Sequence, residues 1–490
     1  MKRVSLLLLL LVALCWASCD KDDVWTVSPN AKLEFSCDTV SFDTIISTHS
    51  SITKTLQVWN RGNDGVRIRR VSLGEGSTSH FRVNVDGEFL QGGSGEDFEV
   101  RGKDSLFVHL EVTLPSSDSD SILAFEDELR FELESGVQQS VKLIASGMDV
   151  YTLRGTVFES DTMLRAGRPY LVYDSLVVCP GATLTLEPGV CLMFHDSVSM
   201  QVHGRLLAPG TLNRPITFRG DRIDRLFADL PYDNTDHRWG GIHFHGESLD
   251  NVMTQCDVHS GDYGILCDSP AHLDPDHPTL VLTNSVIHNV HGMGLSSEGC
   301  YITAVGTQFS NSFGYTLNLI GGAYDFVHCT VAQYYPWDPT SHIALYLSNC
   351  VGDNEEDYRP LHWAHFVNCV ITGRGDDVIE GRILENQDYK CDYLFRNCFL
   401  RTVASNDAER FVNVVYDSDT LAVTGNAHFC NFVDKGYNYS FVPDSLSAIR
   451  GMADTTYTRL LAPFDRLGID RMKEGKPDAG AYQSNYPATE

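Results

Sequence analysis

Basic residues are scarce in this sequence. Its 490 residues include 37 lysines and arginines against 65 aspartates and glutamates, and the formal net charge is -28. A surface with this excess of negative charge repels nucleic acid and gains nothing from anionic lipid head groups. We therefore expect no nucleic-acid partner. The charge also disfavours a polyanionic ligand, unless basic side chains gather locally.

Two further absences narrow the fold class. The chain has 14 cysteines but no Cys-x-x-Cys pair, which removes the usual zinc-binding and thioredoxin-like signatures. Residues 151–435 show neither the 3.6-residue periodicity of helical repeats nor a regular leucine consensus, which argues against both kinds of repeat protein. Strand-like patterning remains, and we expect an all-β protein.

No apolar run is long enough to cross a bilayer. Lys2 and Arg3 precede an apolar stretch at 6–14, whereas a membrane span takes roughly 20 residues. Small residues then precede Cys19. This arrangement is typical of a secretion signal, here residues 1–19, that is processed in the mature protein.

The residues before Cys19 resemble the lipobox of bacterial lipoproteins. The resemblance implies that Cys19 carries the lipid, and Cys15 is the alternative because Trp16 is unusual at its position. The following Asp-Lys-Asp-Asp, residues 20–23, resembles the export signal of Bacteroidetes surface lipoproteins. It implies an outer-membrane lipoprotein displayed on the cell surface, with residues 20–30 as a tether. A solvated charged linker is the alternative for residues 20–23.

Residues 31–150 show the pattern of a β-sandwich. Segments 32–35, 55–59, 105–112 and 128–133 alternate apolar and polar residues, as strands with one buried face do. Turn-forming residues separate the segments. Their order resembles bacterial immunoglobulin-like domains near the ASPM-SPD-2-hydin group, which implies an Ig-like β-sandwich. We expect a spacer or docking module, with ligand binding as the alternative.

Residues 151–435 contain two interleaved ladders of short segments. The first ladder has apolar residues two apart and begins at Ile242, Ile265, Leu295, Leu317 and Leu345, in steps of 23, 30, 22 and 28 residues. The second ladder carries a small or thiol residue, at 255–256, 284–285, 306–307, 328–329, 368–369 and 397–398. A base step near 22 with variable excess predicts a β-helix whose coils carry loops at their corners.

Stacking explains the residues of the second ladder. Coils lie about 4.8 Å apart, so equivalent positions pile on one another. Cysteine suits a narrow core as a small buried hydrophobe, and the asparagine before it suits a corner because it tolerates left-handed backbone. The cysteines therefore indicate packing rather than metal or redox chemistry. A disulfide between adjacent coils stays open, and Cys350 fits neither ladder.

Three segments resemble known β-helix proteins. Residues 181–220 and 239–244 resemble opening coils, and 465–483 resembles a closing segment. The similarity is to Bacteroidetes surface lipoproteins of the right-handed parallel β-helix type. It implies a pectate-lyase-like β-helix over 151–435 and a C-terminal cap segment over 436–490. It implies no activity, since one fold hosts many.

Three insertions between the second and first ladders leave from the same side of the coil stack. They are residues 221–238, 333–341 and 374–391, and they are rich in acidic and aromatic residues. Aromatic rings stack on sugar faces and carboxylates accept hydrogen bonds from hydroxyls. We therefore expect a glycan-binding lip formed by Tyr232, His237, Tyr334, Tyr335, Trp337 and Asp338, with Trp337 near Asp376. Ordinary polar surface loops are the alternative.

Catalytic motifs are incomplete. Asp376 and Asp377 follow a glycine as in one motif of polygalacturonase-type hydrolases, but His291-Gly292 comes too early in the chain and two other motifs are missing. Lys390 and Arg410 lie about one coil apart, a spacing that resembles that of β-helix lyases. The sequence therefore leaves a polysaccharide lyase or glycoside hydrolase as an alternative function.

Outward histidines are the metal candidates. His243 and His245 flank Phe244 on a strand whose apolar residues face the core, and we expect them to lie near Asp257 and His259. Such a group is a candidate metal site, with plain surface histidines as the alternative. The acidic loop 353–357 is a candidate for calcium but lacks EF-hand spacing. We expect no other cofactor.

These features together favour a surface-displayed lipoprotein that binds an extracellular polymer, a glycan above all, through one flank of a β-helix. A polysaccharide-degrading enzyme is the first alternative. The second is a structural partner in an outer-membrane assembly, with a surface protein as its partner and the sandwich as docking piece.

Overall fold

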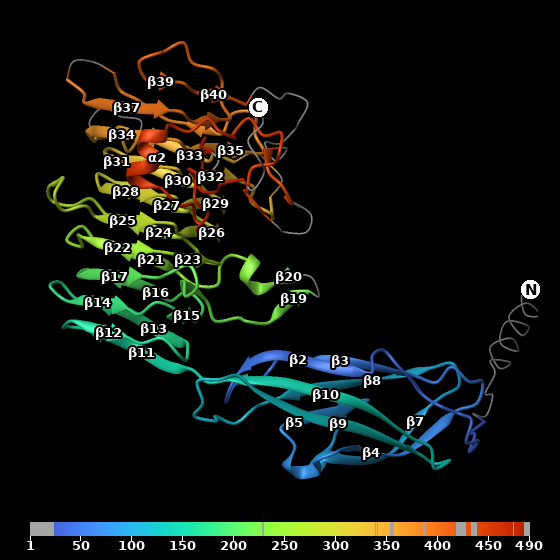
Figure 1. The fold of residues 1–490 in the computed structure, drawn as a ribbon. Helices are drawn as coiled ribbons and strands as arrows, with labels where there is room; N and C mark the ends of the chain where they lie inside the picture. The colour runs from blue at the N-terminus through green and yellow to red at the C-terminus, as the bar shows by residue number, and fades with distance from the viewer. Residues whose placement is uncertain are drawn as a thin grey trace, which may run out of the picture. The chain divides into compact units, whose positions relative to one another are not determined.

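The computed structural model describes residues 24–227, 230–338, 340, 342–352, 357–385, 388–417, 428–432, 439–473 and 475–484. The predicted lipidation site, Cys19, lies outside these residues, as does most of the acidic loop 353–357. The chain forms two compact units, Met1–Asp149 and Val150–Glu490, both built of strands (Figure 1). Within the described part, no helix is long and apolar enough to span a membrane.

The first unit consists of two five-stranded sheets. One sheet has the order β1 (Glu34–Phe35), β3 (Lys54–Trp59), β8 (Ser105–Val112), β5 (Phe81–Val85) and β6 (Glu88–Phe89). The other has the order β2 (Thr39–Ile46), β10 (Gln138–Met148), β9 (Leu123–Leu133), β4 (Val66–Leu73) and β7 (Ser94–Val100). Every pairing is antiparallel except that of β10 with β2.

The alternating sequence pattern decides which face of each strand is buried. In β8, Leu106, Val108, Leu110 and Val112 are buried, and the residues between them are more exposed. Both sheets contribute such apolar residues to one shared core. A layered pair of sheets thus forms because each has one face that must leave water.

The second unit is built of parallel strands in three rows. The strand β11 (Tyr151–Phe158) pairs with β13 (Tyr170–Val178), which then pairs with both β15 and β16. Row A comprises β12 (Thr162–Leu164), β14 (Thr183–Leu186), β17 (Arg205–Pro209), β22 (Asn251–Thr254), β25 (Leu280–Thr283), β28 (Tyr301–Val305), β31 (Gly322–Val327), β34 (Leu361–Val367), β37 (Cys391–Arg396) and β39 (Phe411–Val412).

The other two rows form one large sheet through β13. Row B comprises β15 (Cys191–Phe194), β18 (Ile216–Gly220), β23 (Cys256–His259), β26 (Val286–Val290), β29 (Gln308–Ser312), β32 (Thr330–Gln333), β35 (Val370–Gly373), β38 (Phe399–Leu400) and β40 (Val415–Tyr416). Row C comprises β16 (Ser199–Val202), β21 (Gly241–Phe244), β24 (Ile265–Cys267), β27 (Leu295–Glu298), β30 (Leu317–Ile320), β33 (Leu345–Ser348) and β36 (Ile379–Glu380).

The chain visits the three rows in turn. For example, β25, β26 and β27 form one coil, and β28, β29 and β30 lie beside them in the next coil. Figure 1 shows the coils stacked in sequence order from β11 to β39. Large parallel sheets of this kind are consistent with a β-helix. The prediction of an all-β chain is thereby confirmed.

The first ladder of the sequence is the inner face of row C. Ile242, Ile265, Leu295, Leu317 and Leu345 pair in direct register from coil to coil, and all are completely buried. Equivalent apolar side chains therefore pack as one column through the core. The repeat near 22 residues is the length of one coil without long loops.

The second ladder is the corner between rows A and B. Its leading residues, including Asn284, Asn368 and Asn397, have φ between 48° and 59°, which is the left-handed region that asparagine tolerates. The buried residues that follow are hydrogen-bonded to one another: the amide of Cys329 donates to the sulfur of Cys369, and that of Cys369 to Cys398, each at 3.4 Å. All described cysteines are free thiols, so the ladder is held by packing and hydrogen bonds.

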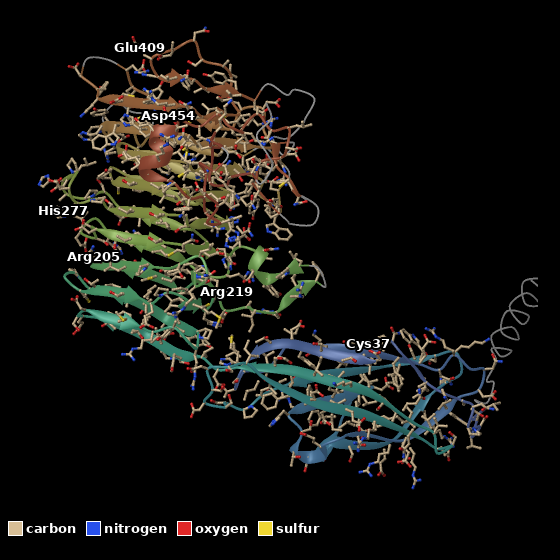
Figure 2. All side chains as sticks on the ribbon, viewed as in Figure 1. Cys37, Arg205, Arg219, His277, Glu409 and Asp454 are labelled. Carbon is tan, nitrogen blue, oxygen red and sulfur yellow. The ribbon has the colours of Figure 1, made fainter. Side chains whose placement is uncertain are left out.

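The described part of the C-terminal segment contacts the corner between rows A and B. Its helix α2 (Thr455–Leu461), which follows Asp454 (Figure 2), lies along the A–B corner. The amide of Asp454 donates to Asn368 at 2.7 Å, Asn397 donates to the carbonyl of Met452, and Gln255 donates to the carbonyl of Arg466. The segment therefore runs back along several coils, because the corner side chains offer it hydrogen bonds.

We expect the exposed thiol of Cys37 to react much faster than the fully buried thiols of the second unit. Cys37 is exposed (Figure 2), whereas burial raises the pKa of the Cys300 thiol to about 11 and also encloses Cys398. Because the accessible thiolate is the reactive species, Cys37→Ser should remove the fast phase of labelling by a disulfide reagent in the native protein. Cys398→Ser should leave that phase unchanged. Fast native labelling of Cys398 would contradict the ladder.

Candidate functional site

The insertion 221–238 folds over the end of row B. It contains the short strands β19 (Arg225–Phe227) and β20 (Leu230–Pro231) and the turn η3 (Tyr232–Asn234). Asp233 forms an ion pair with Arg219 of β18 at 2.5 Å, and Asp236 accepts a hydrogen bond from the hydroxyl of Tyr335. Tyr335 lies 99 residues away in the second predicted lip segment. Two of the three predicted loops therefore do meet.

The third insertion reaches the same place through Arg374. Its guanidinium donates to the backbone carbonyls of Tyr335, at 2.5 Å, and Asp338, at 3.4 Å. The three segments thus join at the corner between rows B and C. We call this corner, with the described residues of 221–238, 333–341 and 374–391, the lip. Their junction is polar, and it is held by a carboxylate, a phenol and a guanidinium.

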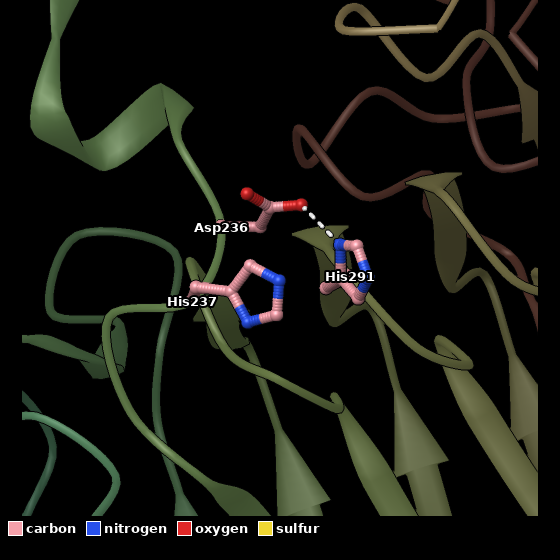
Figure 3. Close-up of side chains that lie close together, drawn as sticks. All are labelled: Asp236, His237 and His291. Atoms are coloured by element: carbon pink, nitrogen blue, oxygen red, sulfur yellow. Dashed lines mark hydrogen bonds and ion pairs between the residues drawn. The ribbon is translucent and has the colours of Figure 1, made fainter.

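The centre of the lip is a group of two histidines and an aspartate. Figure 3 shows the rings of His237 and His291 facing one another below Asp236. Their centroids are 3.9 Å apart, and the Nδ1 of His291 donates to Asp236 at 3.2 Å. On its other side, the Nδ1 of His237 is 2.5 Å from the carboxylate of Asp262.

Stacking of coils places the neighbours of this group. The registers of row B, continued beyond the strands, put Asp262, His291, Phe313 and Tyr335 at equivalent positions of four successive coils. The ring of His291 accordingly stacks on Phe313, with centroids 4.7 Å apart. The step of 22 residues from His291 to Phe313, and again to Tyr335, is present in the sequence. It is the signal by which this column could have been predicted.

Three partly exposed aromatic rings lie along the lip. Tyr263, Phe313 and Trp337 are 38%, 40% and 38% exposed. The ring of Tyr263 lies against Gly292, where a Cβ would stand 2.4 Å from it. Phe313 also contacts the ring of His342, which is 3.5 Å from Asp338. Tyr263, Phe313 and His342 were not among the predicted site residues.

Two of the predicted ligand-binding tyrosines are buried instead. Tyr334 is 1% exposed, and its ring packs against Phe432 and Phe441 in a small core formed with the C-terminal segment. Tyr335 is 5% exposed and is fixed by Asp236. They follow β32 directly, and their rings pack against side chains of other segments, that of Tyr335 against Phe313. Both rings are thus buried in this structure, and a contact of either ring with a ligand stays a prediction.

The other predicted residues lie at the lip or beside it. His237 has a half-exposed side chain, and Trp337 and Asp338 are partly exposed. Tyr232 lies between two cations, with the guanidinium carbons of Arg222 and Arg238 at 4.1 and 5.3 Å from its ring centroid. The expected proximity of Trp337 to Asp376 stays a prediction.

The candidate catalytic residues are engaged with other partners. The side chain of Asp376 is fully exposed and 3.6 Å from Arg401, and Asp377 accepts a hydrogen bond from Thr402. Lys390 is 3.1 Å from His362.

Arg410 pairs with Glu385 at 2.5 Å. Each of these two cations, Lys390 and Arg410, thus has a neighbour of its own, and a catalytic role for them stays a prediction.

The three candidate metal-ligating histidines separate into two groups. His243 and His245 do point outward together, with ring centroids 4.1 Å apart, but their carboxylate is Asp268, at 2.9 and 3.4 Å. His259 does not join them, because β21 belongs to row C and β23 to row B. The expectation that all three gather near Asp257 is thus wrong.

His259 forms a separate, buried ionic group on row B. It is 2.9 Å from Asp257 and 3.4 Å from Asp233, and His288 also donates to Asp257 at 3.1 Å. Burial lowers the pKa of His259, but the two carboxylates raise it more, to about 9. Burial raises the pKa of Asp257, while the charges of His259 and His288 bring it well below its usual range. The group therefore holds the insertion 221–238 against row B.

Comparison with known proteins leaves the family open. No family model matches the chain. A 75-residue stretch is 37% identical to the protein bark beetle of Drosophila melanogaster, which is 15% of this chain and 2% of that protein. The chain thus spans about 2% of the length of that curated relative.

Similar solved structures each cover about a quarter of the chain. One is a PapD-like domain of human CEP192, at 15% identity and a TM-score of 0.17, covering 25% of this chain and 89% of that one. Another is a family 123 glycoside hydrolase from Clostridium perfringens, at 7% identity and a TM-score of 0.19, covering 26% of each chain. A third is a protein of unknown function from Porphyromonas gingivalis, at 14% identity and a TM-score of 0.17, covering 27% of this chain and 59% of that one. These values establish neither fold nor function.

The His259 group predicts a pH-dependent contribution to stability. Its folded pKa, about 9, lies above the unfolded value of roughly 6.5. The contribution is therefore full below the unfolded pKa and is lost as the pH rises through the folded pKa. His259→Gln should lower the free energy of unfolding by on the order of 3 kcal/mol at pH 6, and by much less at pH 10.

Urea unfolding of the variant and the wild type at the two pH values measures this difference. His272→Gln, at an exposed position, is the matched control and should behave as the wild type at both. A loss of stability in His259→Gln that is equal at pH 6 and pH 10 would show that His259 is not charged in the folded protein.

Proposed function

We propose that this protein is a surface-displayed lipoprotein, anchored through Cys19 to an outer membrane of the Bacteroidetes type, that binds an extracellular glycan at the lip. Its second unit is in this proposal a right-handed parallel β-helix of the pectate-lyase-like kind. The first unit is an Ig-like sandwich that acts as spacer or docking module. The row of exposed aromatic rings at one corner of the coil stack carries the proposal.

The geometry of the lip supports a ligand with repeated sugar units. Tyr263, Phe313 and Trp337 come from coils close to one another in the stack, where the spacing of strands is about 4.8 Å. Rings fixed on a stiff scaffold lose little freedom on binding. A flat apolar ring with hydrogen-bonding groups beside it complements a sugar, which has an apolar face and hydroxyls at its rim.

Polar groups beside the rings supply the hydrogen bonds. Asp262, Asp338 and the partly exposed His237 and His291 lie at the same corner. Carboxylates accept hydrogen bonds from hydroxyls, and they repel other carboxylates. With the net charge of -28, this favours a neutral glycan over a uronate polymer.

Removal of one exposed ring should weaken binding. Trp337→Ala should lower retention on a bound polysaccharide by about tenfold or more, since stacked rings contribute on the order of 1–2 kcal/mol each beyond what water replaces. Phe89→Ala removes an even more exposed ring, at 52% against 38% for Trp337, from the first unit and should retain full binding. A panel of neutral and uronate polysaccharides, read for both retention and product release, measures this. Unchanged retention in Trp337→Ala excludes this surface.

The anchor can be tested independently of the ligand. Cys19→Ser should abolish incorporation of a labelled fatty acid and release the protein from the membrane fraction, because the thiol that carries the lipid is gone. Cys15→Ser should retain both. Labelling that persists in Cys19→Ser and disappears in Cys15→Ser would move the anchor to Cys15.

A further inference from the structure

Asp236, His237 and His291 can each offer one ligand atom to a metal ion. These three atoms lie within 4.8 Å of one another. Asp236 and His237 come from the insertion 221–238, whereas His291 follows β26 of row B. The group lies outside the metal candidates that the sequence suggested, and it joins an insertion to the body of the coil stack.

His237 is oriented as metal-binding histidines are. The Nδ1 of His237 is bound to the carboxylate of Asp262 at 2.5 Å, which leaves Nε2 as the nitrogen that faces His291 and Asp236 (Figure 3). A carboxylate on the far nitrogen of a histidine fixes its tautomer and increases its basicity as a ligand. The ring of His291 is held from behind by Phe313, at 4.7 Å between centroids.

The carboxylate of Asp236 is also held in place. It accepts hydrogen bonds from the Tyr335 hydroxyl and from His291. Its side chain is nine-tenths buried, at 11% exposure, while those of His237 and His291 are 52% and 39% exposed. The group thus has a closed side formed by Asp236 and an open side at the two rings, as expected of a site with one free coordination position.

The backbone at His237 points to the same role. Its φ is 57°, in the left-handed region that a histidine adopts only at a cost of roughly 1 kcal/mol or more. In this conformation the ring lies against that of His291, with centroids 3.9 Å apart (Figure 3). Strain of this kind persists at positions where the direction of a side chain matters.

The two other groups of histidine and aspartate are less suited to an ion. In the group of His259, the facing carboxylate Asp233 is already paired with Arg219 (Figure 2) at 2.5 Å. In the group of His243 and His245, the Nε2 of His245 donates to Gln201 at 2.7 Å, and its ring stacks on His203 at 3.8 Å. In each of these groups, another side chain of the protein thus already engages one of the candidate ligands.

We propose that Asp236, His237 and His291 bind a divalent transition-metal ion of the zinc type, with the fourth coordination position open to water or to an oxygen of a ligand. Imidazole and carboxylate are the donors that suit such ions. The bound ion would tie the insertion 221–238 to row B, so it orders the lip. The proposal stands independently of the glycan, because it concerns the ion alone.

Zinc titration of the full chain tests this site. The background should be Cys37→Ser, because Cys37 is an exposed thiol, and the protein should first be stripped with a chelator. Calorimetry should then show one equivalent of Zn²⁺ bound by the background protein. Co²⁺ in place of Zn²⁺ should give the visible absorption of a four-coordinate site.

Matched variants locate the ion. His237→Gly keeps the left-handed backbone and changes a half-exposed side chain, so it should fold and lose at least tenfold in Zn²⁺ affinity, as should His291→Ala. Asp262→Asn should lose about 10- to 100-fold, since it removes the outer carboxylate. His243→Ala and His288→Ala, in the other two groups, should bind as the background does.

Folding is checked by comparing the melting temperatures of the stripped variants. A rise in melting temperature on adding Zn²⁺ should occur in the background and not in His237→Gly. Absence of saturable binding, or binding that survives in both His237→Gly and His291→Ala, overturns the proposal. Loss of the ion only in His243→Ala or His288→Ala would also overturn it.

Discussion

The structure depends on one constraint, the register in which each coil pairs with the next. Ile242, Ile265, Leu295, Leu317 and Leu345 stand directly above one another only because their strands are parallel and in register. A shift of one residue would turn every inward side chain toward solvent. Burial of this column and the backbone hydrogen bonds between coils therefore favour the same register. The corners and the insertions are positioned by that register.

The corner between rows A and B shows how the register is fixed where the chain turns. Asn284, Asn368 and Asn397 take up left-handed backbone that most residues avoid, so each turn occurs at a set residue. The next residue then enters the core and receives an amide hydrogen bond from the coil before it. Asn368 and Asn397 also form hydrogen bonds with the C-terminal segment. These asparagines therefore both set the turn and hold that segment.

At the corner between rows B and C, by contrast, the insertions leave the coil stack. Register brings Asp262, His291, Phe313 and Tyr335 into one column, and the insertion 221–238 adds Asp236 and His237 to it. A rigid column of side chains beside a folded-back loop yields a set of fixed polar and aromatic groups. The ionic group at His259 holds that loop down, since Asp233 bridges His259 and Arg219.

The sequence alone determined the stacked coils, the two ladders and the asparagine corners, because these follow from local spacing and from the size of single side chains. It also predicted that loops would meet on one flank. Only the tertiary structure decided which residues face the lip. Tyr334 and Tyr335 have the composition of a binding loop but are buried, whereas Phe313 and Tyr263, which lie outside the predicted loops, are exposed. His259 was separated from His243 because consecutive strands of one coil lie on different faces. Whether a side chain is buried and which way it points depend on contacts between coils. The spacing of residues along the chain does not reveal those contacts.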